Sequence, residues 1–469
     1  MKKQIFNPYL PPYEYIPDVE PRIFDDRLYV YGSHDKFNGK WYCENDYVCW
    51  SAPLCDLSDW RYEGIIFTKD QDARKGNLYA PDVIQGFDGR YYLYYSKDDS
   101  SVIGIAVCDA PSGRYEYYGE VQYPDGTILG DQDGAYFMFD PSILIDEGRI
   151  WLYSGSSIRK TTTKLKRNMA GCTVSELERD MKTIKTAPKV ILPGSRKWNS
   201  ETFFEGVSAR KIKDWYYLVY PVRNGSGLHY AMSRYPDKDF VHKGCIHSSY
   251  DNGIQGHSFW NQAYPHGNNH GGLIELLGEW YIFDHRMTNN SSFSRQGVAE
   301  KIVIEADGTI KQVVSSSQGL NGRPLLDEGE YPAYIACNLM SRKWFKRIRF
   351  PHKHPFVTQT GVDDDRHSES YVSGLKRGYT AGFKTFAFKG GMYGLTVFVR
   401  GKKGHLVISL DEDGKEQLGE LSVDNSSDWK AYEIQSDIPQ GDHALFMTYR
   451  GRHSIELLKF TIKRREESL

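Results

Sequence analysis

The chain repeats a short aromatic segment five times: LYVYGS at 28–33, YYLYYS at 91–96, IWLYSG at 150–155, YYLVYP at 216–221 and WYIFDH at 280–285. The second residues of these segments lie 59 to 66 positions apart in a chain of 469 residues (Tyr29, Tyr92, Trp151, Tyr217 and Tyr281). Each segment follows a turn and a short strand and precedes two more strands. Radial repetition of such four-stranded units is typical of a β-propeller. We therefore expect an all-β fold with a five-bladed β-propeller over residues 1–325, and a two-sheet sandwich is the alternative.

A second all-β unit is predicted over residues 326–469. The run from Ser315 to Tyr334 has no periodicity and is rich in Gly, Pro and Ser, as connections between domains are. Beyond it, GFKTFAF, LTVFVRG and HALFMTYRG read as short strands separated by turns. A jelly-roll-like β-sandwich is the simplest fold for this pattern, and we expect Trp429 and Tyr432 to pack in its core, with a sugar-binding platform as the alternative.

Composition excludes several classes of partner. The 59 Lys and Arg nearly balance the 61 Asp and Glu, and no long basic run could follow a phosphate backbone or a membrane surface. Prolines and tyrosines interrupt the first residues where a signal peptide needs an apolar stretch. Seven cysteines without CxxC spacing favour reduced thiols. We expect a cytoplasmic protein without nucleic-acid or membrane partners, and the sequence leaves its oligomeric state open.

Ionisable residues stand where each blade should begin its innermost strand. They lie ten to twelve positions ahead of the aromatic anchors: Asp18, Asp82, Asp140, Glu205 and His270. Any one of them alone could simply open a turn. Five ionisable groups at a packed axis would be costly, however, because unpaired buried charge is unfavourable. The coincidence predicts a functional site at the axis.

Converging carboxylates suit the hydrolysis of a glycosidic bond. Like charge and desolvation raise the pKa of at least one carboxyl group, so a general acid and an ionised base can coexist near neutral pH. One group then protonates the leaving oxygen while the other directs water to the anomeric carbon. No covalent nucleophile is required.

Five stretches of the chain resemble glycoside hydrolase family 43 over residues 1 to about 325: NPYLPPYEYIPDVEPRIFDDRLYVYGS, APDVIQGFDGRYYLYYS, FDPSILIDEGRIWLYSGS, FFEGVSARKIKDWYYLVY and NNHGGLIELLGEWYIFDHR. The resemblance implies an inverting mechanism with Asp18 as general base, Glu205 as general acid and Asp140 as the carboxylate that orients the acid and raises its pKa. The family usually has Asp-Pro at the base, whereas Val19 follows Asp18 here. Glu20 therefore competes for the base role, although strand parity favours Asp18.

The resemblance also implies roles for residues around the sugar. Asp82 stands where family members keep a polar group near the substrate. His270 matches a central histidine that in some members helps to hold a calcium ion, and we treat that metal, held through water, as optional. Arg286 either reaches the substrate pocket or faces solvent at a strand end.

A long loop between the fourth and fifth blades, SSYDNGIQGHSFWNQAYPHG, has the composition of a functional rim. In it Phe259 and Trp260 either stack on a sugar ring or belong to a packing insertion.

Together these features predict an exo-acting glycosidase that needs no cofactor and releases β-D-xylose or α-L-arabinofuranose from plant-glycan oligosaccharides. The substrate follows from the resemblance alone. Two alternatives stay open, an endo-arabinanase with an open groove and a non-catalytic carbohydrate-binding propeller. The second domain resembles family 6 carbohydrate-binding modules, so it either binds glycan or braces the pocket.

Overall fold

A computed structural model describes residues 4–157, 167–195, 197, 199–341 and 354–465. Its first two sheets have four antiparallel strands each. The first contains β1 (Glu20–Phe24), β2 (Arg27–Tyr31), β3 (Tyr47–Pro53) and β4 (Arg61–Phe67). The second contains β5 (Leu78–Gln85), β6 (Tyr91–Lys97), β7 (Gly104–Cys108) and β8 (Glu116–Glu120). Short 3₁₀ helices lie at η1 (Lys69–Gln71), η2 (Gly319–Asn321) and η3 (Ala333–Ile335).

Three further sheets complete the propeller, and with them the prediction of a five-bladed all-β fold is confirmed. The third contains β9 (Ser142–Asp146), β10 (Arg149–Ser156), β11 (Gly171–Leu177) and β12 (Lys189–Pro193). The fourth contains β13 (Ser208–Ile212), β14 (Trp215–Pro221), β15 (Leu228–Ser233) and β16 (Val241–His247). The fifth contains β17 (Leu273–Leu276), β18 (Glu279–Thr288) and β19 (Ser291–Ile302).

The fifth blade differs from the predicted four strands. Among the described residues its sheet ends at β19, because the chain then leaves the blade. The backbone N–H of Val313 donates to the carbonyl of Ile246 in the fourth blade at 2.9 Å, so this segment pairs with β16 instead. An isolated parallel bridge between Val19 and Gly271 joins the first and fifth blades and closes the ring.

Apolar side chains hold neighbouring blades together. The aromatic anchors lie on the second strand of each blade and are at most 7% exposed, so the repeat noticed in the sequence is the packing layer between blades. Burial of one large apolar side chain stabilises the fold by about 1.5–3 kcal/mol. All seven cysteines are free thiols, and Cys49, Cys108 and Cys172 belong to these apolar layers. In the described chain, no helix is long and apolar enough to cross a bilayer.

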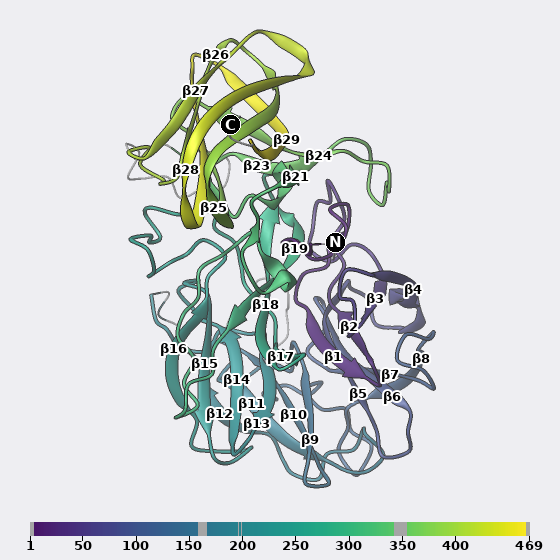
Figure 1. Ribbon diagram of the computed structural model, residues 1–469. Coiled ribbons are helices and arrows are strands. Elements are labelled where there is room, and N and C mark those ends of the chain that lie inside the picture. Colours follow the sequence, from purple (N-terminus) through teal and green to yellow (C-terminus); the bar gives the residue numbers. More distant parts are fainter. Residues whose placement is uncertain (1–3, 158–166, 196, 198, 342–353, 466–469) are drawn as a thin grey trace.

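The C-terminal part forms a ten-stranded, sandwich-like sheet beside one side of the propeller, next to β18 and β19 (Figure 1). Its first strand in the sequence is β20 (Leu325–Leu326). The others are β21 (Gly329–Pro332), β22 (Asn338–Met340), β23 (Phe356–Gln359), β24 (Ser370–Lys376), β25 (Thr380–Gly401), β26 (Gly404–Ser409), β27 (Gln417–Val423), β28 (Ser426–Gly451) and β29 (Ser454–Arg464). The long strands β25 and β28 pair along most of their length.

The two parts share a core and several polar contacts. Tyr250 and Tyr264, from the loop before the fifth blade, are buried among apolar residues of the C-terminal sheet. Lys384 forms a buried ion pair of 3.0 Å with Asp251 of the same loop. Part of this loop therefore packs between the domains, which is one of the two roles expected for it.

Candidate active site

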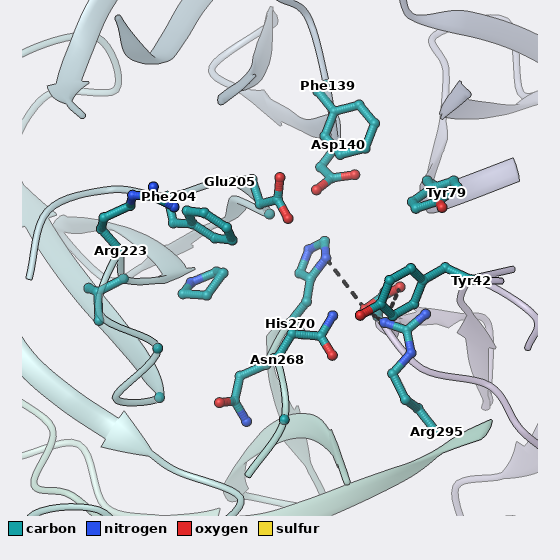
Figure 2. A pocket seen from close by; sticks show the side chains of 18 of the residues that line it. Tyr42, Tyr79, Phe139, Asp140, Phe204, Glu205, Arg223, Asn268, His270 and Arg295 are labelled. Atoms are coloured by element: carbon teal, nitrogen blue, oxygen red, sulfur yellow. Dashed lines mark hydrogen bonds and ion pairs between the residues drawn. The ribbon is translucent and has the colours of Figure 1, made fainter. Parts of the chain in front are cut away.

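A cavity of about 450 Å³ opens at the axis of the propeller (Figure 2). It brings together four residues that are far apart in the sequence: Asp18, Asp140, Glu205 and His270. Figure 2 shows Glu205 and Asp140 extending into this space from one side, with His270 and Arg295 on the other. The structure thus places four of the five predicted axial residues around one cavity.

The start of each inner strand positions these groups. Asp18 and Asp140 stand two residues ahead of β1 and β9, and both have a positive φ, 57° and 49°. Asp tolerates this left-handed region better than most residues, and it turns the side chain out of the strand toward the axis. Because the inner strands converge on the ring centre, residues at this position meet there.

Asp18 is a buried carboxylate held by the Arg295 guanidinium. The Nη1 atom of Arg295 donates to its two carboxylate oxygens at 3.0 and 3.3 Å, and the backbone N–H of Asp18 donates to His285 Nδ1 at 3.3 Å. Burial raises the pKa of Asp18, but the Arg295 guanidinium more than offsets this effect, so the pKa lies below its usual value. Asp35 anchors Arg295 from the other side with an ion pair of 2.8 Å. Asp18 is therefore kept ionised.

Backbone contacts fix the opposite wall of the cavity. The N–H of Asp140 donates to Ser96 Oγ at 3.2 Å. Ahead of Glu205, the N–H of Phe204 donates to the carbonyl of Pro221 at 3.2 Å and its carbonyl accepts from the N–H of Ser157 at 2.8 Å. The segment that carries Glu205 is therefore held by the third and fourth blades together, which limits how far its carboxylate can move.

Comparison with known proteins identifies the family of the chain. The profile of glycosyl hydrolases family 43 matches residues 15–310. A xylosidase/arabinosidase of Thermoclostridium stercorarium is 44% identical over 98% of this chain and 99% of its own length. The chain belongs to glycosyl hydrolase family 43. It is accordingly a glycosidase, as the resemblance predicted.

Solved structures show the same fold. A family 43 arabinoxylan arabinofuranohydrolase from Bacillus subtilis, in complex with cellotetraose, superposes with a TM-score of 0.53 at 19% identity, covering 98% of this chain and 97% of its own. A family 43 enzyme from Xanthomonas citri, complexed with xylose, gives a TM-score of 0.53 at 20% identity over 68% of this chain and 96% of its own. The first likeness extends over the propeller and the C-terminal sheet.

Asp82 does not line the cavity of this family 43 enzyme, contrary to its predicted place beside the sugar. Its carboxylate is fully buried and accepts from Arg22 at 2.6 Å and from the N–H of Ile143 at 2.8 Å. A parallel pair, Glu20 and Arg210 at 2.6 Å, occupies the same layer. These two buried ion pairs fill the axis below the cavity, so Glu20 also lies away from the site.

Strand register explains the error. In the first blade, Asp18 lies four residues ahead of Arg22, the residue that pairs with the aromatic anchor. In the second blade the anchor pairs with Ile84, so the equivalent position is Ala80 rather than Asp82. Ala80 has the positive φ, 36°, that marks this position. Counting back from the anchor missed the true position by two residues, in part because the residue that pairs with the anchor lies eight positions ahead of it in this blade and seven in the first.

We expect Asp82→Asn to lower stability without weakening substrate binding. Removing one partner leaves the Arg22 guanidinium buried and uncompensated, which costs about 3–5 kcal/mol in the free energy of unfolding. Thermal and urea unfolding measure this loss, with Asp88→Asn on the exposed hairpin of the same blade as control. A raised KM with unchanged stability would show instead that Asp82 contributes to substrate binding.

Three other predicted substrate contacts lie outside the cavity lining. Arg286 is buried and donates to the carbonyls of Ala336 and Tyr334 at 2.9 and 2.6 Å, so it ties the fifth blade to the C-terminal part. Phe259 packs edge-on against His266, a cavity residue, with ring centroids 5.4 Å apart. Trp260 is 62% exposed on the loop surface. Arg286 therefore neither reaches the substrate pocket nor faces solvent, the two positions expected for it.

His270 lines the cavity, but its surroundings do not suit direct calcium coordination. Calcium prefers six to eight oxygen ligands. The Asp18 Oδ1 atom lies 3.9 Å from the Nδ1 atom of this ring, and the Asp18 carboxylate already binds the Arg295 cation. No step proposed below uses a metal at this histidine.

Several lining residues had no signal in the sequence. Arg295 comes from β19, and Trp41 and Tyr42 come from the loop between β2 and β3. Asp363 of the C-terminal part braces that loop, accepting from the N–H of Phe37 at 2.6 Å and from Asn45 Nδ2 at 3.0 Å. The C-terminal part therefore helps to shape one wall of the cavity.

Asp363→Ala is expected to lower kcat/KM about tenfold, because the loop with Trp41 and Tyr42 loses its brace and small displacements of binding groups are costly. We expect most of the loss in KM. Steady-state kinetics measure this loss. The control is Asp364→Asn, at the exposed residue next to Asp363. Equal kinetics for the two variants would show that this contact does not position the wall.

Arg295→Lys is expected to move the acidic limb of the kcat/KM profile to higher pH. A lysine ammonium cannot serve both Asp18 and Asp35 as the guanidinium does, so the pKa of Asp18 rises. A base works only when ionised, and activity is then lost at a higher pH as the pH falls. The pH profile is compared with that of Arg61→Lys on the exposed surface. If the acidic limb of the profile did not move, Arg295 would not control the ionisation of the base.

Proposed function

We propose that the protein is an inverting, exo-acting glycosidase that releases β-D-xylose or α-L-arabinofuranose from short plant-glycan oligosaccharides. One observation carries the proposal: Asp18, kept ionised by Arg295, lines the same cavity as two further carboxyl groups, Asp140 and Glu205. The name of the relative that is 44% identical, xylosidase/arabinosidase, supports the choice of sugars.

In this reaction Asp18 acts as general base. Above its lowered pKa the carboxylate accepts a proton from water as the water oxygen attacks the anomeric carbon. Arg295 remains protonated and limits the choice of proton acceptor to the carboxylate. Because the guanidinium binds the carboxylate throughout, it also fixes the direction in which the base faces.

Glu205 acts as general acid and gives its proton to the leaving oxygen, while Asp140 orients it and raises its pKa, as the family resemblance implies. Gly206, directly after the acid, has φ +65°, and a Cβ there would lie 3.1 Å from the His270 ring. A glycine at this position lets His270 pack closely under the segment. In inverting enzymes the two carboxyl groups are separated by room for one water, roughly 6.5–9.5 Å.

The size of the cavity favours short substrates. A volume of about 450 Å³ lies in the lower half of the range for small-molecule pockets, roughly 300–1,000 Å³. Such a space suits the end of an oligosaccharide better than the interior of a long chain. This favours exo-action over an arabinanase groove.

Incubation with nitrophenyl β-xyloside, nitrophenyl α-arabinofuranoside, xylo-oligosaccharides and linear arabinan tests the proposal. We expect turnover of one or both nitrophenyl pentosides and release of single pentoses from oligosaccharide ends. Internal cleavage of arabinan, seen as a rapid fall in viscosity, would contradict exo-action. If the protein bound these sugars but cleaved none of them, the proposed catalytic function would be wrong.

A further inference from the structure

A second cluster of polar side chains lies on the fourth blade, apart from the residues that line the cavity. His229 is on β15 and His242 on the neighbouring strand β16, and Glu201 comes from the segment that leads to Glu205. One potential ligand atom from each of these three side chains lies within 4.8 Å of the others. His229 is buried, whereas His242 and Glu201 are exposed, so the cluster opens to solvent on one side.

The two imidazoles are arranged as a pair. His229 Nδ1 and His242 Nε2 are 2.9 Å apart, and the rings are stacked with an interplanar angle of 9°. Ser226 Oγ lies 3.0 Å from His229 Nε2, the nitrogen that faces away from the cluster. An outer partner of this kind fixes the tautomer and the ring orientation of a metal-binding histidine.

The chemistry of these donors selects the kind of ligand. The buried His229 places Nδ1 at the cluster, and an imidazole nitrogen binds transition metals as a neutral donor. Two imidazoles and one carboxylate suit zinc and related first-row divalent metals, whereas calcium and magnesium prefer sets of oxygen atoms. A hydrogen bond between the two rings is the simpler account of their contact, and it leaves the carboxylate beside them without a role.

We propose that Glu201, His229 and His242 form a binding site for a divalent first-row transition metal such as zinc. With Zn–N distances of roughly 2.0–2.1 Å, two ligands at the tetrahedral angle stand about 3.3 Å apart. The nitrogens, now 2.9 Å apart, would need to separate by a few tenths of an ångström. Water would complete the coordination on the exposed side.

The site would tie down the segment that carries Glu205. Residues 200–204 already pair with the end of β14, since the N–H of Arg223 donates to the carbonyl of Thr202 at 3.0 Å. A metal held by Glu201 would add a link from this segment to β15 and β16. The proposal concerns metal binding alone and does not depend on the proposed glycosidase mechanism.

Titration of the metal-free, untagged full-length protein with zinc chloride by calorimetry tests the site. We expect about one equivalent to bind, and the affinity to fall by about tenfold or more in His242→Ala and in Glu201→Gln, as loss of a contact at a metal site commonly does. Both side chains are exposed, so both variants should fold. His453→Ala, an exposed histidine of the C-terminal part, is the control and should bind zinc as the parent does.

Two further readouts distinguish this site from adventitious binding. Cobalt should give visible absorption bands that His242→Ala lacks, and zinc should raise the melting temperature of the parent but not of that variant. No saturable binding to the parent, or undiminished binding by both Glu201→Gln and His242→Ala, would overturn the proposal.

Discussion

Asp18→Asn is expected to lower kcat by about 10²- to 10⁴-fold on every substrate that the enzyme accepts. The amide cannot take a proton from water, and this loss does not depend on how good the leaving group is. Asn is close in size to Asp, so the cavity should keep its shape. Steady-state kinetics with an activated nitrophenyl glycoside and with an unactivated oligosaccharide measure both losses.

Stability must be followed in the same variant. Asp18 is one of two carboxylates around the buried Arg295, and Asp35 keeps its own ion pair of 2.8 Å. We expect a lower melting temperature but a folded protein with a normal circular dichroism spectrum. A folded Asp18→Asn variant with more than about a tenth of the parental kcat would remove Asp18 from the base role.

Glu205→Gln is expected to show a loss that depends on the leaving group. A nitrophenolate departs without much help, so its release should slow far less than that of an unactivated sugar, for which the full loss of about 10²- to 10⁴-fold applies. The measurement is the ratio of kcat/KM for the nitrophenyl glycoside to that for the oligosaccharide. That ratio should rise in Glu205→Gln and stay unchanged in Asp18→Asn.

The two variants are matched controls for each other, because both replace a carboxyl group by an amide in the same cavity. If Glu205→Gln lost equal activity on both substrates, it would not be the proton donor. If Asp18→Asn showed the dependence on the leaving group instead, the two roles would be exchanged.

Much of the fold could be predicted because each blade repeats the same packing problem. The aromatic anchors recur at the interface between blades, and the strand ahead of each anchor must begin at the axis. That geometry brought Asp18, Asp140, Glu205 and His270 to one cavity. Position along the repeat was sufficient for these four residues.

The same reasoning failed where a shift of two residues moves a side chain to another layer. Asp82 occupies the same position in its strand as Glu20, two residues ahead of the residue that pairs with the aromatic anchor. Both carboxylates form ion pairs with arginines below the cavity. A count from the anchor cannot detect that the partner of the anchor lies one residue farther ahead in this blade than in the first. The acid that was predicted to be functional at this position is therefore part of a structural ion pair.

Contacts across the ring could not be predicted from a single sequence. Arg295 meets Asp18 although 277 residues separate them, and no local pattern distinguishes that arginine from the others. The same holds for Asp363, which reaches the first blade from the C-terminal part. Such partners depend on how the first and fifth blades and the second domain meet.

The central claim is that Asp18 activates water rather than attacking the sugar itself. Proton NMR of the first-formed product, recorded before mutarotation on the pentoside that is turned over fastest, tests this most directly. The account predicts a product of inverted anomeric configuration, such as α-xylose from a β-xyloside. A product of retained configuration would contradict it.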